Sequence, residues 1–67
     1  MLKITKRVEY ALIAIRHLQE NQDVLVSVSD ISAAYGIPKE ILAKTLQKLA
    51  SSNIVKSYKG PTGGYKA

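Results

Sequence analysis

Gly36, Ile37 and Pro38 interrupt the chain between two stretches with a helical pattern. Glycine is the residue that most readily takes the left-handed conformation at the end of a helix. Pro38 keeps Ile37 extended and suits the first turn of a new helix, where its missing N–H costs nothing. A helix, a tight glycine turn and a second helix are typical of a helix-turn-helix, whose second helix can enter the DNA major groove.

The second of these helices is predicted over residues 38–52, which are mostly strong helix formers. At about 100° per residue, its apolar side and its polar side separate cleanly. The apolar side comprises Leu42, Thr45, Leu46 and Leu49. The polar side comprises Glu40, Lys44, Gln47 and Ser51, flanked by Ala43 and Lys48. This polar side fits either a solvated helix surface or a surface that contacts a ligand, and the helix alone leaves both open.

The chain has 67 residues and no cysteine. This length predicts one small domain over residues 1–67, near the lower limit for folding without a covalent or metal staple. The lack of cysteine excludes disulfides and cysteine-based metal sites in this chain, and it fits a reducing compartment. No apolar run approaches the roughly 20 residues that span a bilayer, and the N-terminus lacks the apolar region of a signal peptide. A cytoplasmic location is therefore expected.

The net charge of +5 is distributed unevenly along the chain. Residues 1–37 carry as many basic as acidic side chains, so the whole excess belongs to residues 38–67, where six lysines face one acid, Glu40. A basic half beside a neutral half indicates a protein that binds a polyanion, above all nucleic acid.

The N-terminal region predicts a first helix, capped by Thr5 and ending near Glu20 or Asn21. We expect Tyr10 and Ile13 on its outer side, either as isolated exposed apolar residues or as a surface that a longer protein covers. Its expected core stripe comprises Ile4, Val8, Ala11, Leu12, Ile15 and Leu18.

Residues 24–26 predict a short strand, followed by a second helix over residues 28–35. Ser27 is expected to cap this helix, with Asp30 as the partner in a capping box. Val26 and Ile31 are placed for a hydrophobic staple. Val28, Ile31 and Ala34 are expected to face inward.

The C-terminal part predicts a β-hairpin after a left-handed residue at Asn53. Residues 54–58 alternate as in a strand with Ile54 inward, residues 59–64 form a glycine-rich turn, and residues 65–67 begin the return strand. The predicted fold is α+β: a winged helix-turn-helix of three helices with a small β-hairpin wing.

Three segments resemble the N-terminal domain of the Rrf2 family of bacterial transcription regulators: Thr5 to Leu12 (TKRVEYAL), Asp30 to Ile37 (DISAAYGI) and Gly60 to Tyr65 (GPTGGY). The resemblance implies a DNA-binding domain whose partners are double-stranded DNA and a second copy in a homodimer. Family members usually continue into a dimerisation helix, and in many of them three nearby cysteines hold an iron–sulfur cluster. Because this chain ends at Ala67 without cysteine, we expect a truncated or isolated domain that holds no cofactor itself.

DNA contacts are expected from three regions. Phosphates would be met by Ser27, Ser29, Pro38 (through its backbone) and Lys39, and, as the resemblance implies, by Lys6, Arg7 and Tyr10. Base edges would be met by Glu40, Ala43, Lys44 and Gln47. The wing would contribute Lys59, Gly60, Pro61, Thr62 and Gly63. Glu40 equally suits a first-turn carboxylate that favours the helix dipole, and Lys59 equally suits a solvated turn.

Catalysis finds no support in the sequence. His17 and Glu20 form an i, i+3 pair on the first helix without a third metal ligand, and the serines have no base beside them. The function that remains is helix 38–52 in the major groove with wing 59–64 on the adjacent backbone or minor groove. The alternative is a winged-helix module whose basic face binds an acidic protein or RNA.

Overall fold

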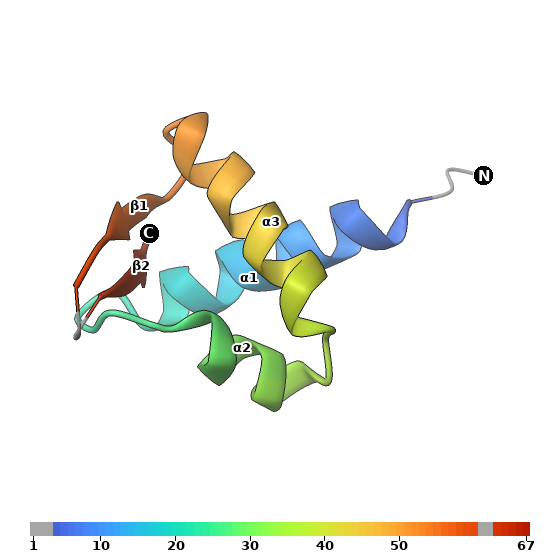
Figure 1. Ribbon diagram of the computed structural model, residues 1–67, viewed down its shortest axis with the longest axis horizontal. Coiled ribbons are helices and arrows are strands. Elements are labelled where there is room, and N and C mark those ends of the chain that lie inside the picture. The colour runs from blue at the N-terminus through green and yellow to red at the C-terminus, as the bar shows by residue number, and fades with distance from the viewer. Residues whose placement is uncertain (1–3, 61–62) are drawn as a thin grey trace.

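The structure is a computed structural model that describes residues 4–60 and 63–67. Three helices come first, α1 (Lys6–Glu20), α2 (Val28–Tyr35) and α3 (Lys39–Ser51), and strands β1 (Lys56–Tyr58) and β2 (Gly64–Lys66) follow as an antiparallel hairpin. Figure 1 shows α3 crossing in front of α1, with the hairpin at one end of the molecule and the N-terminus at the other. The predicted winged helix-turn-helix is confirmed. None of the described helices has the length and apolar character needed to cross a membrane.

The helix termini follow the predicted local chemistry. The Thr5 hydroxyl accepts a hydrogen bond from the Val8 N–H at the start of α1. At the start of α2 the capping box is complete: the Asp30 N–H donates to the Ser27 hydroxyl at 3.1 Å, and the Ser27 N–H donates to the Asp30 carboxylate at 3.4 Å. Pro38 is the N-cap residue of α3 rather than its first helical residue.

The core lies where the three helices and the base of the hairpin meet. Val26 and Ile31, the predicted staple pair, both belong to it. Its fully or almost fully buried side chains are Ala14, Leu18, Val26, Ile31, Ile37, Leu42, Leu46 and Val55.

The predicted core stripe of α1 is confirmed at Leu18 and Ile15 and is wrong at Ile4, Val8 and Leu12. Ala14 and Leu18 are fully buried, whereas Leu12 is 55% exposed and Val8 and Ile4 are about as open. Tyr10 and Ile13, expected on the outer side, are partly buried and pack against the core. The helix is therefore rotated relative to the prediction, because it carries apolar residues around most of its circumference and packing selects among them.

Smaller corrections concern α2 and the strands. Ala34 is exposed, so Ile31 and Val28 alone carry the inward face of α2. Ile54 is exposed and Val55 is buried, which inverts the predicted alternation of the first strand. The predicted strand at residues 24–26 is reduced to one bridge, in which Val26 exchanges backbone hydrogen bonds with Tyr65 at 2.8 and 3.0 Å. As a result, β2 lies between Val26 and β1, and it begins one residue earlier than predicted.

Candidate nucleic-acid interface

Helix α3 is held by its apolar side, so its polar side projects away from the molecule. Leu42 and Leu46 are fully buried, as the sequence predicts. The opposite side of the helix carries exposed Glu40, Lys44 and Gln47, with Ala43 half-buried beside them. The predicted base-contacting residues therefore lie on the side of α3 that the core leaves uncovered.

The turn before α3 fixes its direction. Gly36 has φ of 65°, the left-handed conformation that favours glycine, and its N–H donates to the Ser32 carbonyl oxygen at 2.9 Å. The Ser32 hydroxyl donates to the Ile37 carbonyl oxygen at 2.6 Å, and Ile37 itself is buried in the core. This double attachment orients Pro38 and Lys39 at the exposed start of α3.

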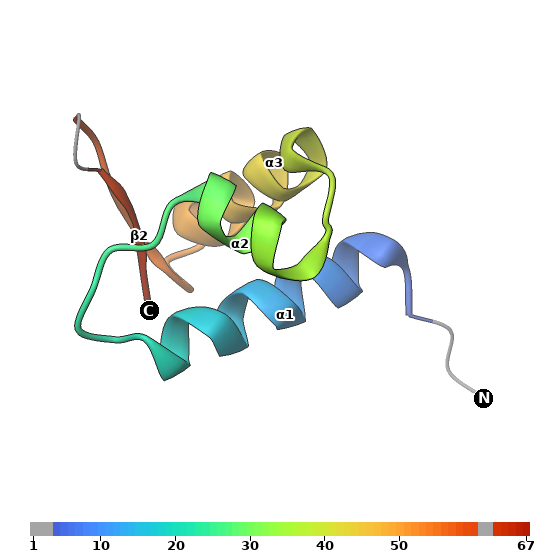
Figure 2. The same ribbon diagram turned by 90° about the horizontal axis from the view of Figure 1, so that it is seen from below.

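The hairpin presents a tight turn on the same side as α3. Figure 2 shows the hairpin turn and α3 projecting in the same direction, with α1 on the opposite side. Gly60 has φ of 111°, and its carbonyl oxygen accepts from the Gly63 N–H at 3.0 Å. Lys59 is exposed next to this turn. Pro61 and Thr62, the other predicted contact residues, lie outside the described residues.

Gly63 and Gly64, at the end of the turn and the start of β2, leave no space for a side chain. A Cβ on Gly63 would lie 2.3 Å from the Tyr58 carbonyl oxygen, and a Cβ on Gly64 would lie 2.8 Å from the Val26 carbonyl oxygen. A side chain at position 63 would push the end of the turn away from β1. A side chain at position 64 would push β2 away from Val26.

A polar hollow of about 540 Å³ separates α3 from the hairpin. Ser27, Val28 and Gln47 line it on one side, and residues 57–59 and 63–65 line it on the other. This hollow connects the exposed side of α3, through Gln47, with the hairpin.

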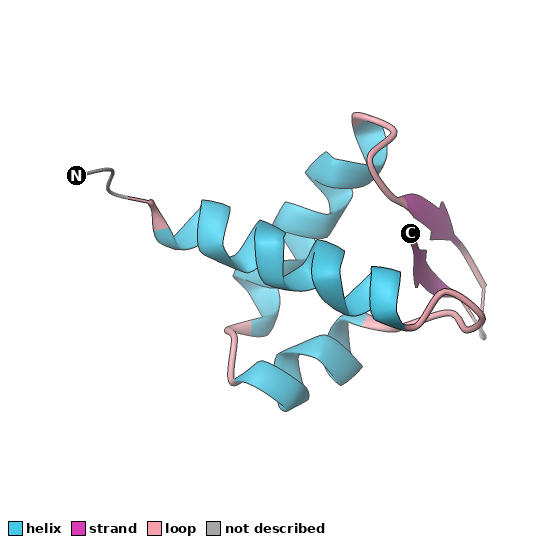
Figure 3. Cartoon of the chain, turned by 180° about the vertical axis from the view of Figure 1, so that it is seen from behind, coloured by secondary structure: helices cyan, strands magenta, loops and turns pink. Residues whose placement is uncertain are grey.

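The other predicted contacts differ in how open they are. The Ser27 hydroxyl accepts a hydrogen bond from the Asp30 N–H and keeps its own proton to donate to a phosphate. The Asp30 carboxylate lies beside Ser27, and its negative charge disfavours a phosphate there. Ser29 is exposed. At the start of α1, Lys6 is paired with Glu9 at 3.4 Å, Arg7 is exposed, and Tyr10 packs against the core. This region lies at the far end of the molecule from the hairpin (Figure 3).

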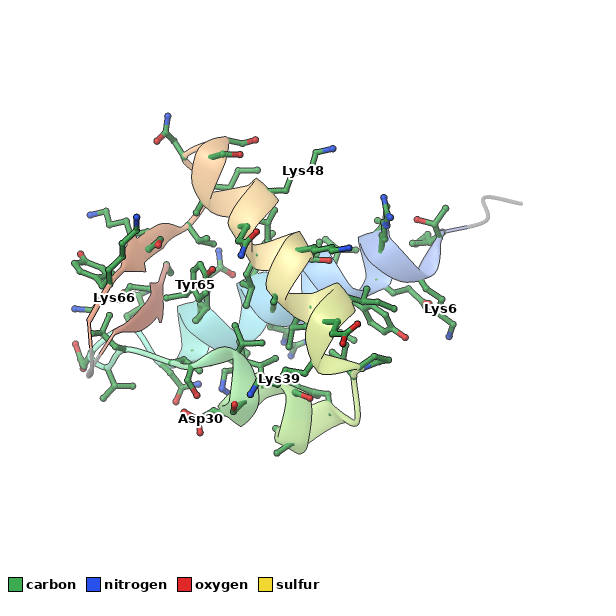
Figure 4. All side chains as sticks on the ribbon, viewed as in Figure 1. Lys6, Asp30, Lys39, Lys48, Tyr65 and Lys66 are labelled. Carbon is green, nitrogen blue, oxygen red and sulfur yellow. The ribbon has the colours of Figure 1, made fainter. Side chains whose placement is uncertain are left out.

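Among the residues that the structure describes, no lysine of α3 or of the hairpin forms an ion pair. Both ion pairs found among the described residues, Lys6–Glu9 and Arg16–Glu20, lie within α1. From Ile41 to Ala67 the sequence contains no aspartate or glutamate, while it contains five lysines. Figure 4 shows two lysines of α3, Lys39 and Lys48, and Lys66 of the hairpin as sticks on the ribbon.

The sequence reasoning missed an apolar groove of about 470 Å³ between α1 and α3. Its floor includes Val8, Leu12 and Ile41, each of them substantially exposed, and its rim includes Arg7 and Lys44. The sequence does contain the signal, an apolar stripe on α1 through Val8 and Leu12, but the pattern alone predicts this stripe to face the core.

Within residues 4–60 and 63–67, no set of side chains is arranged to hold an iron–sulfur cluster or another metal centre. The chain contains no cysteine, and in this described part no three His, Asp or Glu side chains come together where they could hold a metal ion. The residues present therefore do not fit the cluster that the resemblance implies for longer proteins.

Comparison with known proteins identifies the family. The model of the Rrf2 family, described as an iron-dependent transcriptional regulator, matches residues 4–66. A protein of Aquifex aeolicus that carries an HTH-type transcriptional regulator name is 45% identical over 58 residues, which are 87% of this chain and 40% of the relative. The HTH-type transcriptional regulator IscR of Vibrio campbellii is 35% identical over 69 residues, with 97% of this chain and 39% of IscR covered.

Solved structures agree. CymR, the global cysteine regulator of Bacillus subtilis, superposes with a TM-score of 0.91 at 27% identity, over 98% of this chain and 52% of CymR. A transcriptional regulator of Listeria innocua gives 0.89 at 29% identity, over 96% of this chain and 45% of that protein. The chain spans about 40% of the length of the curated relatives it matches. It belongs to the Rrf2 family, which comprises transcriptional regulators rather than enzymes, and it forms their winged helix-turn-helix DNA-binding domain.

Proposed function

We propose that this domain binds duplex DNA with the exposed side of α3 in the major groove and the hairpin turn against the adjacent backbone or minor groove. The observation that carries the proposal is the common direction of α3 and the hairpin turn in Figure 2, with the polar hollow between them. A groove-filling helix with a neighbouring loop on the same side matches the curvature of a duplex.

The roles of individual residues follow from their chemistry. On α3, Lys44 donates to guanine O6 and N7, Glu40 accepts from cytosine N4, and the Ala43 methyl meets a thymine methyl. Gln47, which lines the hollow, is placed for a base or a phosphate on the strand that runs toward the wing.

Phosphate contacts are proposed around this centre. Lys39 and the backbone at Pro38 lie at the start of α3, and Ser27 and Ser29 lie at the start of α2. Lys59 contacts a phosphate or enters the minor groove, and the backbone of Gly60 and Gly63 approaches the duplex closely. The remaining proposed backbone contacts are Lys6, Arg7, Tyr10, Pro61 and Thr62.

The test is fluorescence anisotropy with a mixed-sequence duplex at several salt concentrations. We expect the wild type to bind with Kd on the order of 10⁻⁴–10⁻⁶ M near physiological salt and more tightly at low salt. Lys59→Ala should reduce the slope of log K against log salt by about one unit, as expected for one lost phosphate contact. Arg16→Ala, which removes a cation from the side of α1 away from α3, is the matched control.

No binding of the wild type at low salt would contradict the proposal. The basic face would then be assigned to an acidic protein or RNA, the alternative that the sequence leaves open.

We also propose that the regulator acts as a homodimer on DNA with two half-sites. Support comes from the single α3 of each chain, which spans one half-site, and from the open apolar groove between α1 and α3. Sedimentation with and without a two-site duplex tests this, and a strict one-to-one complex at saturation would contradict it.

Any iron–sulfur cluster of a longer parent protein is proposed to be ligated entirely outside these 67 residues, because they contain no cysteine.

A further inference from the structure

The groove between α1 and α3 leaves aliphatic side chains uncovered. Val8 and Leu12 of α1 are 47% and 55% exposed, and Ile41 of α3 is 41% exposed. Val8 and Leu12 are four residues apart, so they lie on one face of α1 and form one wall, while Ile41 stands on the other wall. We call these three residues the floor of the groove. A ligand with an apolar body gains free energy by covering them.

Three cations stand around this floor. Arg7 comes from the first turn of α1, and Lys44 and Lys48 come from successive turns of α3. Figure 4 shows Lys48 on the side of α3 away from the hairpin. The ion pairs among the described residues involve none of these three cations, which we call the rim. Since Glu40 is the one acid that lines the groove, the lining has an excess of positive charge that suits an anion.

The dimensions of the groove favour a small molecule over a helix. Its volume of about 470 Å³ is within the roughly 300–1,000 Å³ of ligand pockets. Its α1 wall extends from Arg7 to Leu12, which is about 8 Å at 1.5 Å per residue. A helix that binds in a groove uses anchors as far apart as i and i+7, a span of roughly 10.5 Å. The shorter wall therefore favours a compact ligand.

We propose that the groove binds a medium-chain aliphatic carboxylate, with its apolar body on the floor and its carboxylate among the rim cations. An aliphatic chain suits the floor better than a ring, because no aromatic side chain is among the described residues that line the groove. The carboxylate suits the rim, because guanidinium and ammonium groups form charge-assisted hydrogen bonds with it.

The bound acid acts against DNA binding, an inference that rests on the proposed function. Lys44 belongs to the rim and also to the polar side of α3 that is proposed to meet base edges. A carboxylate paired with Lys44 withdraws this cation from the duplex and adds a negative charge near the phosphates. The groove is therefore an effector site whose occupation weakens the DNA complex.

The first test measures octanoate binding to the DNA-free protein by heteronuclear NMR titration. We expect saturable shifts of amide signals from residues 7–12 and 40–49, which line the groove. The expected Kd is on the order of 1 mM, as is typical of a ligand of this size. Octanamide keeps the apolar body without the charge, and acetate keeps the charge without the apolar body. Both should bind at least about threefold more weakly.

Matched variants assign the site. Leu12→Gln removes part of the floor and should weaken octanoate binding about five- to tenfold. Leu25→Gln changes an exposed leucine outside the groove and should leave binding unchanged. Lys48→Gln should weaken binding about two- to fivefold, whereas Lys39→Gln, the same charge change on α3 outside the groove, should have less than about a twofold effect. Circular dichroism confirms that each variant is folded.

The second test measures duplex affinity by fluorescence anisotropy at constant ionic strength. We expect saturating octanoate to weaken binding by about fivefold or more, in the usual range of coupling between two sites. Acetate at the same concentration should have no effect, which controls for salt. Leu12→Gln should bind the duplex as the wild type does and lose the response to octanoate.

Several outcomes would overturn the proposed site. Octanoate shifts that do not saturate, or equal binding of octanamide, would exclude the carboxylate. Equal losses from Leu12→Gln and Leu25→Gln would place the acid elsewhere. A DNA-free dimer that Leu12→Gln dissociates in sedimentation would assign the groove to a second copy. Displacement of octanoate at lower concentration by a helical peptide with glutamates beside a leucine stripe would assign it to a helix.

The two tests also separate this inference from the proposed function. If the wild type binds duplex equally well with and without octanoate, the effector role is overturned and the proposed function stands. If it binds octanoate in the groove but binds no duplex at low salt, the proposed function fails and the effector role fails with it, while the acid site is retained.

Discussion

His17 of α1 and Tyr35 of α2 are joined by a side-chain hydrogen bond, with 2.8 Å between the imidazole Nδ1 and the phenol oxygen. The rings also meet edge to face, with centroids 5.4 Å apart. Tyr35 is the last residue of α2, directly before Gly36. The contact therefore attaches the end of the first helix of the helix-turn-helix to α1.

Tyr35→Phe removes the hydroxyl of this contact and keeps the ring. We expect the free energy of unfolding to fall by about 0.5–1.5 kcal/mol, since one partly exposed hydrogen bond is lost. Urea denaturation followed by circular dichroism measures the change. Tyr58→Phe is the control, because Tyr58 is 45% exposed and its hydroxyl has no hydrogen bond within the described residues. Equal effects of both substitutions would show that the His17 contact does not stabilise the fold.

The capping box at α2 gives a prediction about the stability of the free protein. Ser27→Ala removes the acceptor of the Asp30 N–H and should cost about 0.5–2 kcal/mol of stability. Ser29→Ala, two residues later and exposed, should change stability by less than about 0.5 kcal/mol. Thermal unfolding of the free protein compares the two. A larger loss from Ser29→Ala would contradict the capping geometry.

A change in the shape of the hairpin turn should weaken DNA binding while it leaves the helices folded. Gly63→Ala introduces a Cβ 2.3 Å from the Tyr58 carbonyl oxygen, so the turn next to Lys59 must change shape. We expect weaker duplex binding with the helical circular dichroism signal retained, because the turn contributes no fully buried side chain. Gly36→Ala is the contrasting variant: it has open space but φ of 65°, so we expect it to lower stability by about 1 kcal/mol. Wild-type affinity for Gly63→Ala would show that the shape of the turn does not matter for binding.

The features that the sequence predicts correctly are local ones. The capping box joins Ser27 to Asp30 within three residues, and the Gly36 turn depends on the conformational freedom of one residue. The polar side of α3 is equally evident, because its apolar residues are confined to one side and leave no choice of orientation. Most of the candidate interface could therefore be predicted without a structure.

The features that sequence analysis missed depend on contacts between distant residues. On α1, Val8 and Leu12 compete with Tyr10 and Ala14 for the core, and the apolar pattern is nearly as good for either pair. Only packing against α3 decides which side is covered. The groove between α1 and α3 follows from that decision, so it could not be recognised before the orientation of α1 was known.

This orientation of α1 gives the last prediction. Leu18 is fully buried, whereas Leu12, six residues earlier on the same helix, is 55% exposed in the groove. Leu18→Ala should lower the free energy of unfolding by about 2–5 kcal/mol, enough to unfold much of a domain this small. Leu12→Ala should cost less than about 1 kcal/mol, because its side chain gives up little buried area. Urea denaturation of the two variants measures the difference. Equal losses, or a greater loss from Leu12→Ala, would mean that the stripe through Val8 and Leu12 faces the core and that the groove is closed in solution.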